Sequence, residues 1–220
     1  MDKIIILGAS GHACVVHDVF VSENKYHVAG FVDPHFEEET MVQGVPVLGA
    51  DEDIPNIIRD AEIKGFFVAI GVNHIRERVV RKVLAMGLNL ELVTGVHSNA
   101  FVSPHAKLGA GVIVMPGSVV NAGGTIAEGC VVNTGATIDH DSALQPYAHV
   151  APGAHLGGNC FVGHRAYVGL GASVIHGVAI GDDAVVGAGS VVISEIEKLS
   201  LAYGIPAKAM RTREPNESYL

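Results

Sequence analysis

Residues 126–150 read IAEGCVVNTGATIDHDSALQPYAHV, and a branched aliphatic residue returns at every sixth position of this stretch. The spacing continues on both sides without an insertion. It covers sixteen positions, all of them Val, Ile or Leu: Val102, Leu108, Val114, Val120, Ile126, Val132, Ile138, Leu144, Val150, Leu156, Val162, Val168, Val174, Ile180, Val186 and Val192. A period of six matches neither an α-helix nor the alternation of a simple strand, so it predicts short strands separated by corners, three strands to a coil.

Two positions before each branched residue lies a small residue, never larger than valine, from Ala100 to Ser190. One branched and one small residue in every six suit the narrow interior of a stacked solenoid. We therefore predict a left-handed parallel β-helix of hexapeptide repeats, with five coils over residues 102–191. Glycines that directly follow a branched residue are expected to form its turns, because glycine accepts backbone conformations that other residues avoid: Gly109, Gly157, Gly163, Gly169, Gly181 and Gly187.

Residues 1–95 show a different pattern. Apolar strands are expected at 3–7, 27–32 and 66–70, with a helix after the first and another after the third. The second helix should turn its apolar residues inward and its charged residues outward: Ile75, Val79, Val80, Val83 and Leu84 against Arg76, Glu77, Arg78, Arg81 and Lys82. This order predicts a Rossmann-like α/β domain with a mostly parallel sheet. The expected domains are therefore 1–95, the β-helix at 96–193 and a C-terminal tail at 194–220.

Ligands of such sheets bind at the carboxyl ends of the strands, here the Gly8–His12 loop, Asp33 and Gly71. The loop opens a helix, whose free N–H groups suit a phosphate. It lacks the third glycine of the dinucleotide pattern G-x-G-x-x-G, so NAD binding is not expected. A nucleotide site and a purely structural strand-to-helix turn both remain open for this loop.

Composition excludes several classes of protein. The formal net charge is −9 and no basic cluster occurs, so no nucleic-acid partner is expected. No apolar run approaches the length of a membrane span, and only four apolar residues follow Lys3, too few for a signal-peptide core. Three widely spaced cysteines favour reduced core residues in a cytoplasmic protein. No His, Cys and Asp set has ligand spacing on one face, so no metal is expected.

Among the histidines of the predicted β-helix, His140 has a distinctive setting, with Asp139 and Asp141 on either side. It follows the interior residue Ile138 by two positions, so its side chain should project outward. A carboxylate that is hydrogen-bonded to one imidazole nitrogen fixes the tautomer and raises the basicity of the other nitrogen. His140 is therefore expected to act as a general base.

Four stretches together resemble one family over essentially the whole chain: residues 4–12 (IIILGASGH), 69–73 (AIGVN), 133–141 (NTGATIDHD) and 203–208 (YGIPAK). The family is that of the nucleotide-sugar acyltransferases, which includes the bacillosamine-pathway and perosamine N-acetyltransferases and the sialic acid O-acetyltransferases. The resemblance implies a homotrimer, with acetyl-CoA in the groove between adjacent β-helices and the N-terminal domain holding a nucleotide sugar.

The resemblance also implies residue roles. His140 would be the catalytic base and Asp141 the residue that raises its basicity. The nucleotide sugar would be bound by Ser10, Gly11, His12, Asp33, Pro34, Gly71 and Asn73, with Pro34 standing where relatives have a second acidic residue. Acetyl-CoA would be bound by His149, Gly158, Leu170 and Ala188, partly through backbone groups.

The implied reaction is direct acetyl transfer to the C4 amine of a 4-amino-4,6-dideoxy nucleotide sugar, UDP-linked and of the bacillosamine type. No acyl-enzyme is expected, because no activated Ser or Cys nucleophile is evident. Two alternatives remain open. One is O-acetylation of a sugar hydroxyl, as in the sialic acid enzymes, and the other is a non-catalytic trimeric binding scaffold.

Overall fold

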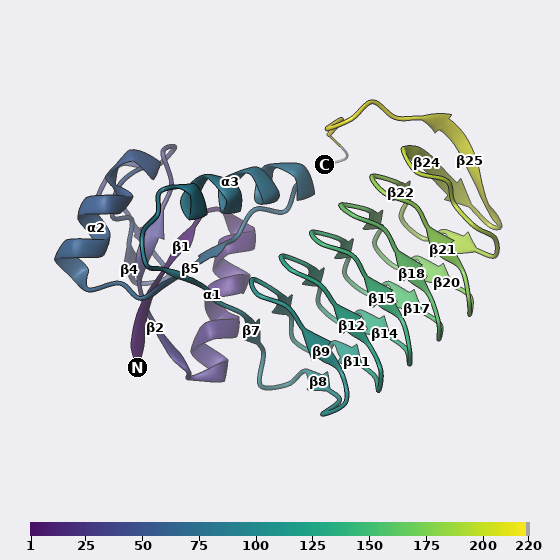
Figure 1. Cartoon of the computed structure of the whole chain (residues 1–220), viewed down its shortest axis with the longest axis horizontal. Coiled ribbons are helices and arrows are strands. Elements are labelled where there is room, and N and C mark those ends of the chain that lie inside the picture. The colour runs from purple at the N-terminus through teal and green to yellow at the C-terminus, as the bar shows by residue number, and fades with distance from the viewer. Residues whose placement is uncertain (219–220) are drawn as a thin grey trace. The chain divides into compact units, whose positions relative to one another are not determined.

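A computed structural model describes residues 1–218, which form two compact units. Unit 1 comprises Met1–Gly71 and Ile75–Ser98, and unit 2 comprises Val72–His74 and the chain from Asn99 onward. The first is an α/β domain and the second a parallel β-helix (Figure 1). The fold predicted from the sequence, an α/β domain followed by a β-helix of hexapeptide coils, is confirmed.

Unit 1 is built on a parallel sheet with the strand order β2-β1-β5-β6. Its strands are β1 (Asp2–Leu7), β2 (Tyr26–Val32), β5 (Gly65–Val68) and β6 (Glu91–Leu92). The other elements are α1 (Gly11–Glu23), the hairpin β3 (Met41–Val42) and β4 (Val45–Pro46), the 3₁₀ turn η1 (Asp51–Asp53), α2 (Ile54–Ala61), α3 (Asn73–Ala85) and β7 (Gly95–Val96). The parallel sheet is buried, as its unbroken apolar strands require.

The prediction for the faces of α3 is wrong at two positions. Arg76 is buried, because its guanidinium donates hydrogen bonds to the carbonyls of Ile70 (2.9 Å) and Gly71 (3.1 Å) at the end of the third strand. A charged group can be buried when it is hydrogen-bonded in this way. Leu84, expected to point inward, is 40 % exposed near the last turn of the helix.

The β-helix of unit 2 has three faces, which we call faces 1, 2 and 3. Face 1 contains β10 (Ile113–Val114), β13 (Val131–Val132), β16 (His149–Val150), β19 (Tyr167–Val168) and β22 (Val185–Val186). Face 2 contains β8 (Phe101–Val102), β11 (Val119–Val120), β14 (Thr137–Ile138), β17 (His155–Leu156), β20 (Ser173–Val174) and β23 (Val191–Val192). Face 3 contains β9 (Lys107–Leu108), β12 (Thr125–Ile126), β15 (Ala143–Leu144), β18 (Phe161–Val162) and β21 (Ala179–Ile180).

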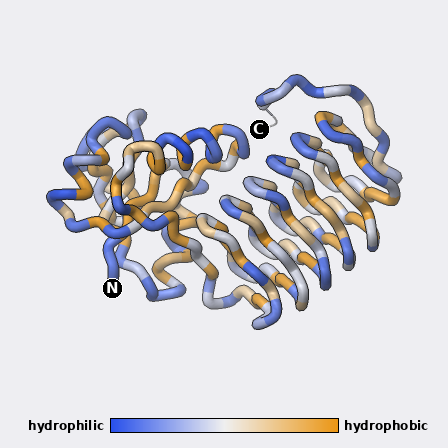
Figure 2. Tube along the Cα trace, in the orientation of Figure 1, coloured by the Kyte–Doolittle hydropathy of each residue, from blue (hydrophilic) through white to orange (hydrophobic). Residues whose placement is uncertain are grey.

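Each strand is two residues long and pairs in parallel with the strand 18 residues further along, as when Ile138 meets Leu156. The branched residue of each strand therefore stacks on its equivalents in the coils above and below. From Val114 to Val192 every member of this series is buried. Figure 2 shows the same pattern as hydrophobic segments that recur along the coils. The six-residue spacing in the sequence is thus the spacing of the interior.

The prediction that glycines after the branched residue form the turns is wrong. Those glycines have no left-handed backbone, which recurs instead three residues after every branched residue from Leu108 to Val186, at Gly135, Asp141 and Gly153 among others. The predicted glycines serve close approach between coils. A Cβ atom on Gly109 would lie 2.8 Å from the backbone nitrogen of Glu128, and one on Gly157 would lie 2.7 Å from that of His176.

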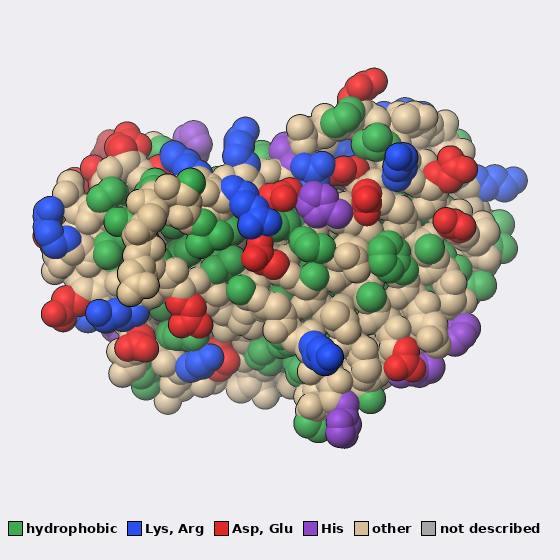
Figure 3. Space-filling model, in the orientation of Figure 1, with side chains coloured by type: hydrophobic (Ala, Val, Ile, Leu, Met, Phe, Trp, Pro, Cys, Tyr) green, Lys and Arg blue, Asp and Glu red, His purple; other side chains and the backbone are tan. Residues whose placement is uncertain are grey.

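The C-terminal tail adds a hairpin to face 1. Strand β24 (Ser200–Gly204) pairs in parallel with β22, and β25 (Ala207–Thr212) pairs with it in antiparallel orientation. The last coil of this face is therefore covered by further strands. The new edge carries the exposed charged residues Lys208 and Arg211, and such residues discourage further strand pairing. On the face displayed in Figure 3, acidic and basic side chains are interspersed.

The two roles of glycine can be separated by two substitutions. Gly109→Ala places a Cβ atom against backbone that cannot move without shifting the next coil, so we expect unfolding to become easier by about 1–3 kcal/mol. Gly153→Asn occupies a left-handed corner (φ 65°) with open space, where asparagine is tolerated, and should change stability by less than about 1 kcal/mol. Thermal and denaturant unfolding measure both. Equal losses in the two variants would contradict this distinction.

Candidate active site

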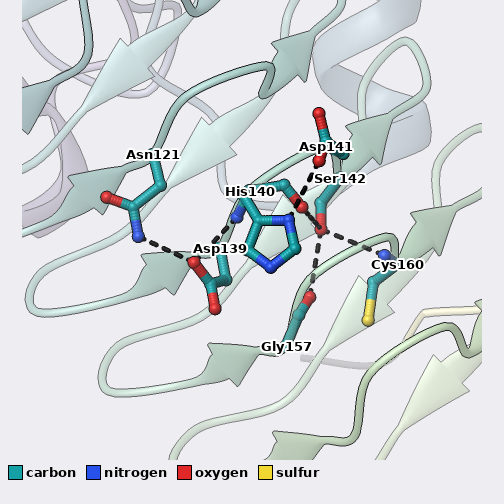
Figure 4. Close-up of polar contacts among 7 residues, drawn as sticks. All are labelled: Asn121, Asp139, His140, Asp141, Ser142, Gly157 and Cys160. Atoms are coloured by element: carbon teal, nitrogen blue, oxygen red, sulfur yellow. Dashed lines mark hydrogen bonds and ion pairs between the residues drawn. The ribbon is translucent and has the colours of Figure 1, made fainter.

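His140 lies at the corner between β14 and β15, which we call corner 2/3 because it joins face 2 to face 3 (Figure 4). Ser142 fixes the course of the chain there. Its hydroxyl donates to the carbonyl of Gly157 (3.0 Å) and accepts from the backbone N–H of Cys160 (3.0 Å). The carbonyl of His140 accepts a hydrogen bond from Asn159 in the next coil (2.9 Å). The histidine therefore projects from a corner that is tied to the neighbouring coil.

The imidazole of His140 is paired with the carboxylate that follows it. Nδ1 of His140 lies 2.9 Å from Oδ2 of Asp141, which occupies the left-handed corner position (φ 58°). Because the carboxylate stabilises the protonated imidazole, the hydrogen bond to Asp141 raises the pKa of His140 above its ordinary value. With Nδ1 engaged, Nε2 is the nitrogen left to accept a proton. The side chain is about half exposed, at 51 %.

Asp139 orients the start of the same corner. Its Oδ1 accepts hydrogen bonds from the backbone N–H of His140 (2.8 Å) and from the side-chain amide of Asn121 in the preceding coil (2.9 Å). The first of these bonds, and then the second, lowers the pKa of Asp139, so its carboxylate stays ionised. Asn121 was not among the predicted site residues. It precedes Asp139 by 18 residues, one coil, and this interval is the signal that could have identified it.

Gly158 gives the imidazole its space. It lies one coil beyond His140 at corner 2/3, and a Cβ atom on it would lie 2.5 Å from both Nε2 and Cε1 of His140. One coil further, at the same corner, is His176, whose ring centroid is 6.2 Å from that of His140. The structure therefore brings together His140, Asp141 and Gly158 of the predicted site, and adds His176 to them.

The other predicted acetyl-CoA residues lie elsewhere on the β-helix. Leu170 and Ala188 occupy successive coils of corner 1/2, where face 1 meets face 2, and both line a hollow of about 340 Å³ beside the C-terminal hairpin. His149 is buried on face 1, with its Nε2 3.1 Å from the amide nitrogen of Asn133 and its ring against Tyr167. Within one copy of the protein, face 2 lies between the corner that carries Leu170 and Ala188 and the corner that carries His140.

Gly158, Leu170 and Ala188 nevertheless have one backbone property in common. Within residues 1–218, the N–H groups of Gly158, Leu170 and Ala188 donate no hydrogen bond, because each lies two residues after a branched position, outside the ladder between coils. Free N–H groups of this kind are suited to the amide carbonyls of a pantetheine arm and to a thioester oxygen. The residues present therefore fit the acetyl-CoA that the sequence implies.

The predicted sugar-binding residues of unit 1 gather at the ends of β1, β2 and β5. Asp33 is buried, and its Oδ2 accepts the backbone N–H of Ala9 (2.8 Å) while its Oδ1 accepts that of His35 (2.9 Å). Asp33 therefore links the end of β2 to the Gly8–His12 loop. Ser10 and Gly11 are exposed at the start of α1, and Ser10 makes no side-chain hydrogen bond that caps this helix. The first N–H groups of α1 are therefore suited to an anion.

His12 is neutral in this loop. Burial, reinforced by the positive charge of Arg76, lowers the pKa of His12 to about 4. Its Nε2 is buried and has no hydrogen-bond partner among the described residues, so this atom can accept a hydrogen bond from a ligand. Gly71 is partly exposed close to the buried Arg76, whereas Pro34 is exposed.

Asn73 is placed differently from the rest of the predicted sugar-binding group. It belongs to unit 2, and its amide nitrogen donates to the carbonyls of Arg165 (2.9 Å) and Ala166 (3.2 Å). In the described part of the chain, no group of three or more His, Cys, Asp or Glu side chains could hold a metal ion. None of the helices in residues 1–218 is long and apolar enough to cross a membrane.

A hexapeptide β-helix with a carboxylate-paired histidine on an outer corner defines the class of the protein as an acyltransferase. Comparisons with known proteins narrow the class. Residues 3–83 match the family described as the PglD N-terminal domain. Perosamine N-acetyltransferase from Caulobacter crescentus, solved with CoA and GDP-perosamine, has 40 % sequence identity and a TM-score of 0.89, covering 96 % of this chain and 98 % of that one.

Two further relatives are also acetyltransferases. The acetyltransferase domain of PglB from Neisseria gonorrhoeae, solved with acetyl coenzyme A, is 34 % identical with a TM-score of 0.86, covering 94 % of this chain and 98 % of that one. UDP-N-acetylbacillosamine N-acetyltransferase from Bacillus subtilis is 32 % identical over 119 residues, about half of each chain (52 %). This chain belongs to the family of nucleotide-sugar N-acetyltransferases that these proteins represent, as its sequence motifs predicted.

The pairing of His140 with Asp141 predicts a measurable change in pKa. Asp141→Asn keeps a residue that tolerates the left-handed corner but removes the negative charge. The pKa of His140 should therefore fall, since its raised value depends first on this hydrogen bond. Titration of the imidazole resonances by NMR measures the change, with His105 as an internal reference in the same spectra. An unchanged pKa in the variant would contradict the assigned pairing.

The contact between Gly158 and His140 predicts a loss of activity without a loss of fold. In Gly158→Ala the added methyl group would displace the imidazole, which can swing away because it is the end of a side chain. Misplacing a catalytic group by about 1 Å can cost roughly 10²-fold in rate. We expect kcat of acetyl transfer to fall by about that factor while the melting temperature stays near that of the wild type. A large drop in melting temperature would show that the methyl group disturbs the coils instead.

Proposed function

We propose that this protein transfers the acetyl group of acetyl-CoA directly to the C4 amine of a nucleotide-linked 4-amino-4,6-dideoxy sugar, with His140 as the general base. The observation that carries the proposal is the pair formed by Nδ1 of His140 and Oδ2 of Asp141, 2.9 Å apart on an outer corner of an acyltransferase β-helix. Family membership supports the substrate class, since the Caulobacter relative was solved with CoA and GDP-perosamine.

In the proposed reaction, the amine nitrogen attacks the thioester carbon while Nε2 of His140 takes a proton from that nitrogen. The new C–N bond forms, the C–S bond then breaks, and CoA leaves with a proton on its sulfur. Gly158 lies next to the imidazole, and its free N–H is suited to stabilise the oxyanion of the tetrahedral intermediate. A positioned general base contributes about 10² to 10⁴ in rate.

The proposal extends to a homotrimer, because three of the predicted acetyl-CoA residues lie on two different edges of the prism. Gly158 shares corner 2/3 with His140, whereas Leu170 and Ala188 lie on corner 1/2. A groove that uses both edges needs corner 1/2 of one copy to face corner 2/3 of another. Such a head-to-tail contact closes into a ring, and three copies of a three-sided prism suit a cyclic assembly.

In this proposal unit 1 holds the nucleotide. The uncapped start of α1 suits a diphosphate, and neutral His12 offers an acceptor nitrogen beside it. The sequence predicts a UDP-linked sugar of the bacillosamine type, and the Bacillus relative is named for a UDP sugar. GDP-perosamine, bound in the Caulobacter relative, is the alternative nucleotide sugar.

Mass spectrometry of products tests the proposal. Purified protein with acetyl-CoA and UDP-, GDP- and dTDP-linked 4-amino sugars should add one acetyl group to at least one of them. His140→Gln should lower kcat by about 10² to 10⁴ without unfolding the protein, because it removes the base but keeps a polar side chain. His105→Gln, at an exposed corner two coils away, is the matched control and should retain full activity.

Other outcomes would contradict the proposal. Acetylation of a sialic acid hydroxyl with every amine untouched would favour O-acetyl transfer. Absence of CoA binding in calorimetry would favour a binding scaffold. Near-wild-type turnover by His140→Gln would remove His140 from the mechanism while leaving the substrate class intact.

A further inference from the structure

Corner 2/3 carries a second imidazole, that of His176, to which the proposed reaction assigns no role. His140, Gly158 and His176 occupy the same position of this corner in three successive coils, at intervals of 18 residues. His176 is exposed, and within residues 1–218 its side chain makes no hydrogen bond. Its ring centroid is 6.2 Å from that of His140, with the two ring planes tilted by 47°.

The glycine between them keeps this gap open. A Cβ atom on Gly158 would meet Nε2 and Cε1 of His140 at 2.5 Å, so Nε2 lies at the level of the glycine and toward the coil of His176. Nδ1 is already bonded to Asp141, so a proton that enters or leaves His140 must pass through Nε2. A separation of this size between two rings is suited to a proton transfer through one intervening water.

The proposed reaction moves a proton from the amine to the sulfur. The amine loses a proton as the C–N bond forms, whereas the sulfur gains a proton as the C–S bond breaks. The nitrogen and the sulfur are different substituents of the tetrahedral carbon, so two imidazoles on the same corner can each serve one of them.

We infer that His176 is a second proton-carrying residue, which receives the proton from His140 and delivers it to the departing thiolate of CoA. The inference rests on the proposed function. In one turnover the proton passes from the amine nitrogen to Nε2 of His140, then through water to His176, and finally to sulfur. Both imidazoles are neutral again when the amide and free CoA leave, so the step needs no further reactant.

The test compares His176→Gln with His105→Gln, a matched exposed histidine at the same corner two coils before Asp141. We expect kcat of His176→Gln to fall at least about tenfold, within the range for a lost proton-transfer group, with the KM values of acetyl-CoA and sugar changed less than about twofold. Added imidazole should restore part of kcat, because a small diffusible base can occupy the vacated space. His105→Gln should match the wild type with and without imidazole.

Several results would overturn the assignment. An unchanged kcat in His176→Gln would show that the second imidazole carries no proton. A loss that imidazole does not restore, or that appears mainly in KM or in the melting temperature, would assign His176 a binding or structural role. A wild-type protein that acetylates no 4-amino sugar would overturn the proposed function and this assignment together, whereas an active wild type with an unaffected variant would overturn the assignment alone.

Discussion

The parallel hydrogen-bond ladder between coils is the constraint on which the rest of the β-helix depends. It requires every strand to meet its partner 18 residues away, so each side chain has an equivalent directly above and below it. A two-residue strand has too few hydrogen bonds to be stable alone, and only stacking on both sides stabilises it. One inserted residue would turn the interior positions of all later coils outward, which explains why the spacing continues without interruption from Val102 to Val192.

The same ladder determines where glycine is needed. At some positions just after a branched residue, such as Gly109 and Gly157, the coils approach so closely that a Cβ atom would meet the backbone of the next coil, whereas other coils carry a side chain there, as at Asp139. The left-handed turn comes two residues later and tolerates other residues, including Asp141 and Asn159. Asp141 is therefore both a corner residue and the partner of His140, so the backbone geometry of the corner helps to place the carboxylate that raises the pKa of this imidazole.

Chemistry at corner 2/3 follows from stacking. Asn121 in the preceding coil bonds to Asp139, which accepts the backbone N–H of His140, and Gly158 in the next coil leaves space for the imidazole. The contacts of Asn121 and Gly158 cross between coils, so a single strand could not supply them. The N–H groups that are left out of the ladder at these corners are suited to a thioester or a pantetheine arm. The architecture thus supplies rigid donors at regular intervals, and in the proposed function a few particular residues make one corner reactive.

The sequence alone determined the β-helix, its interior and the outward position of His140, because a solenoid repeats its local rules at every coil. It also identified the α/β domain and the strand ends that meet at the glycine loop. Burial of Arg76 and the hydrogen bonds of Asn73 were decided by tertiary structure, since both side chains bond to carbonyls that local periodicity does not locate. The separation of Leu170 and Ala188 from His140 was likewise decided by the three-sided winding of the chain. Residues that are equivalent in the repeat lie on different edges of the prism, and only the fold shows which edge each occupies.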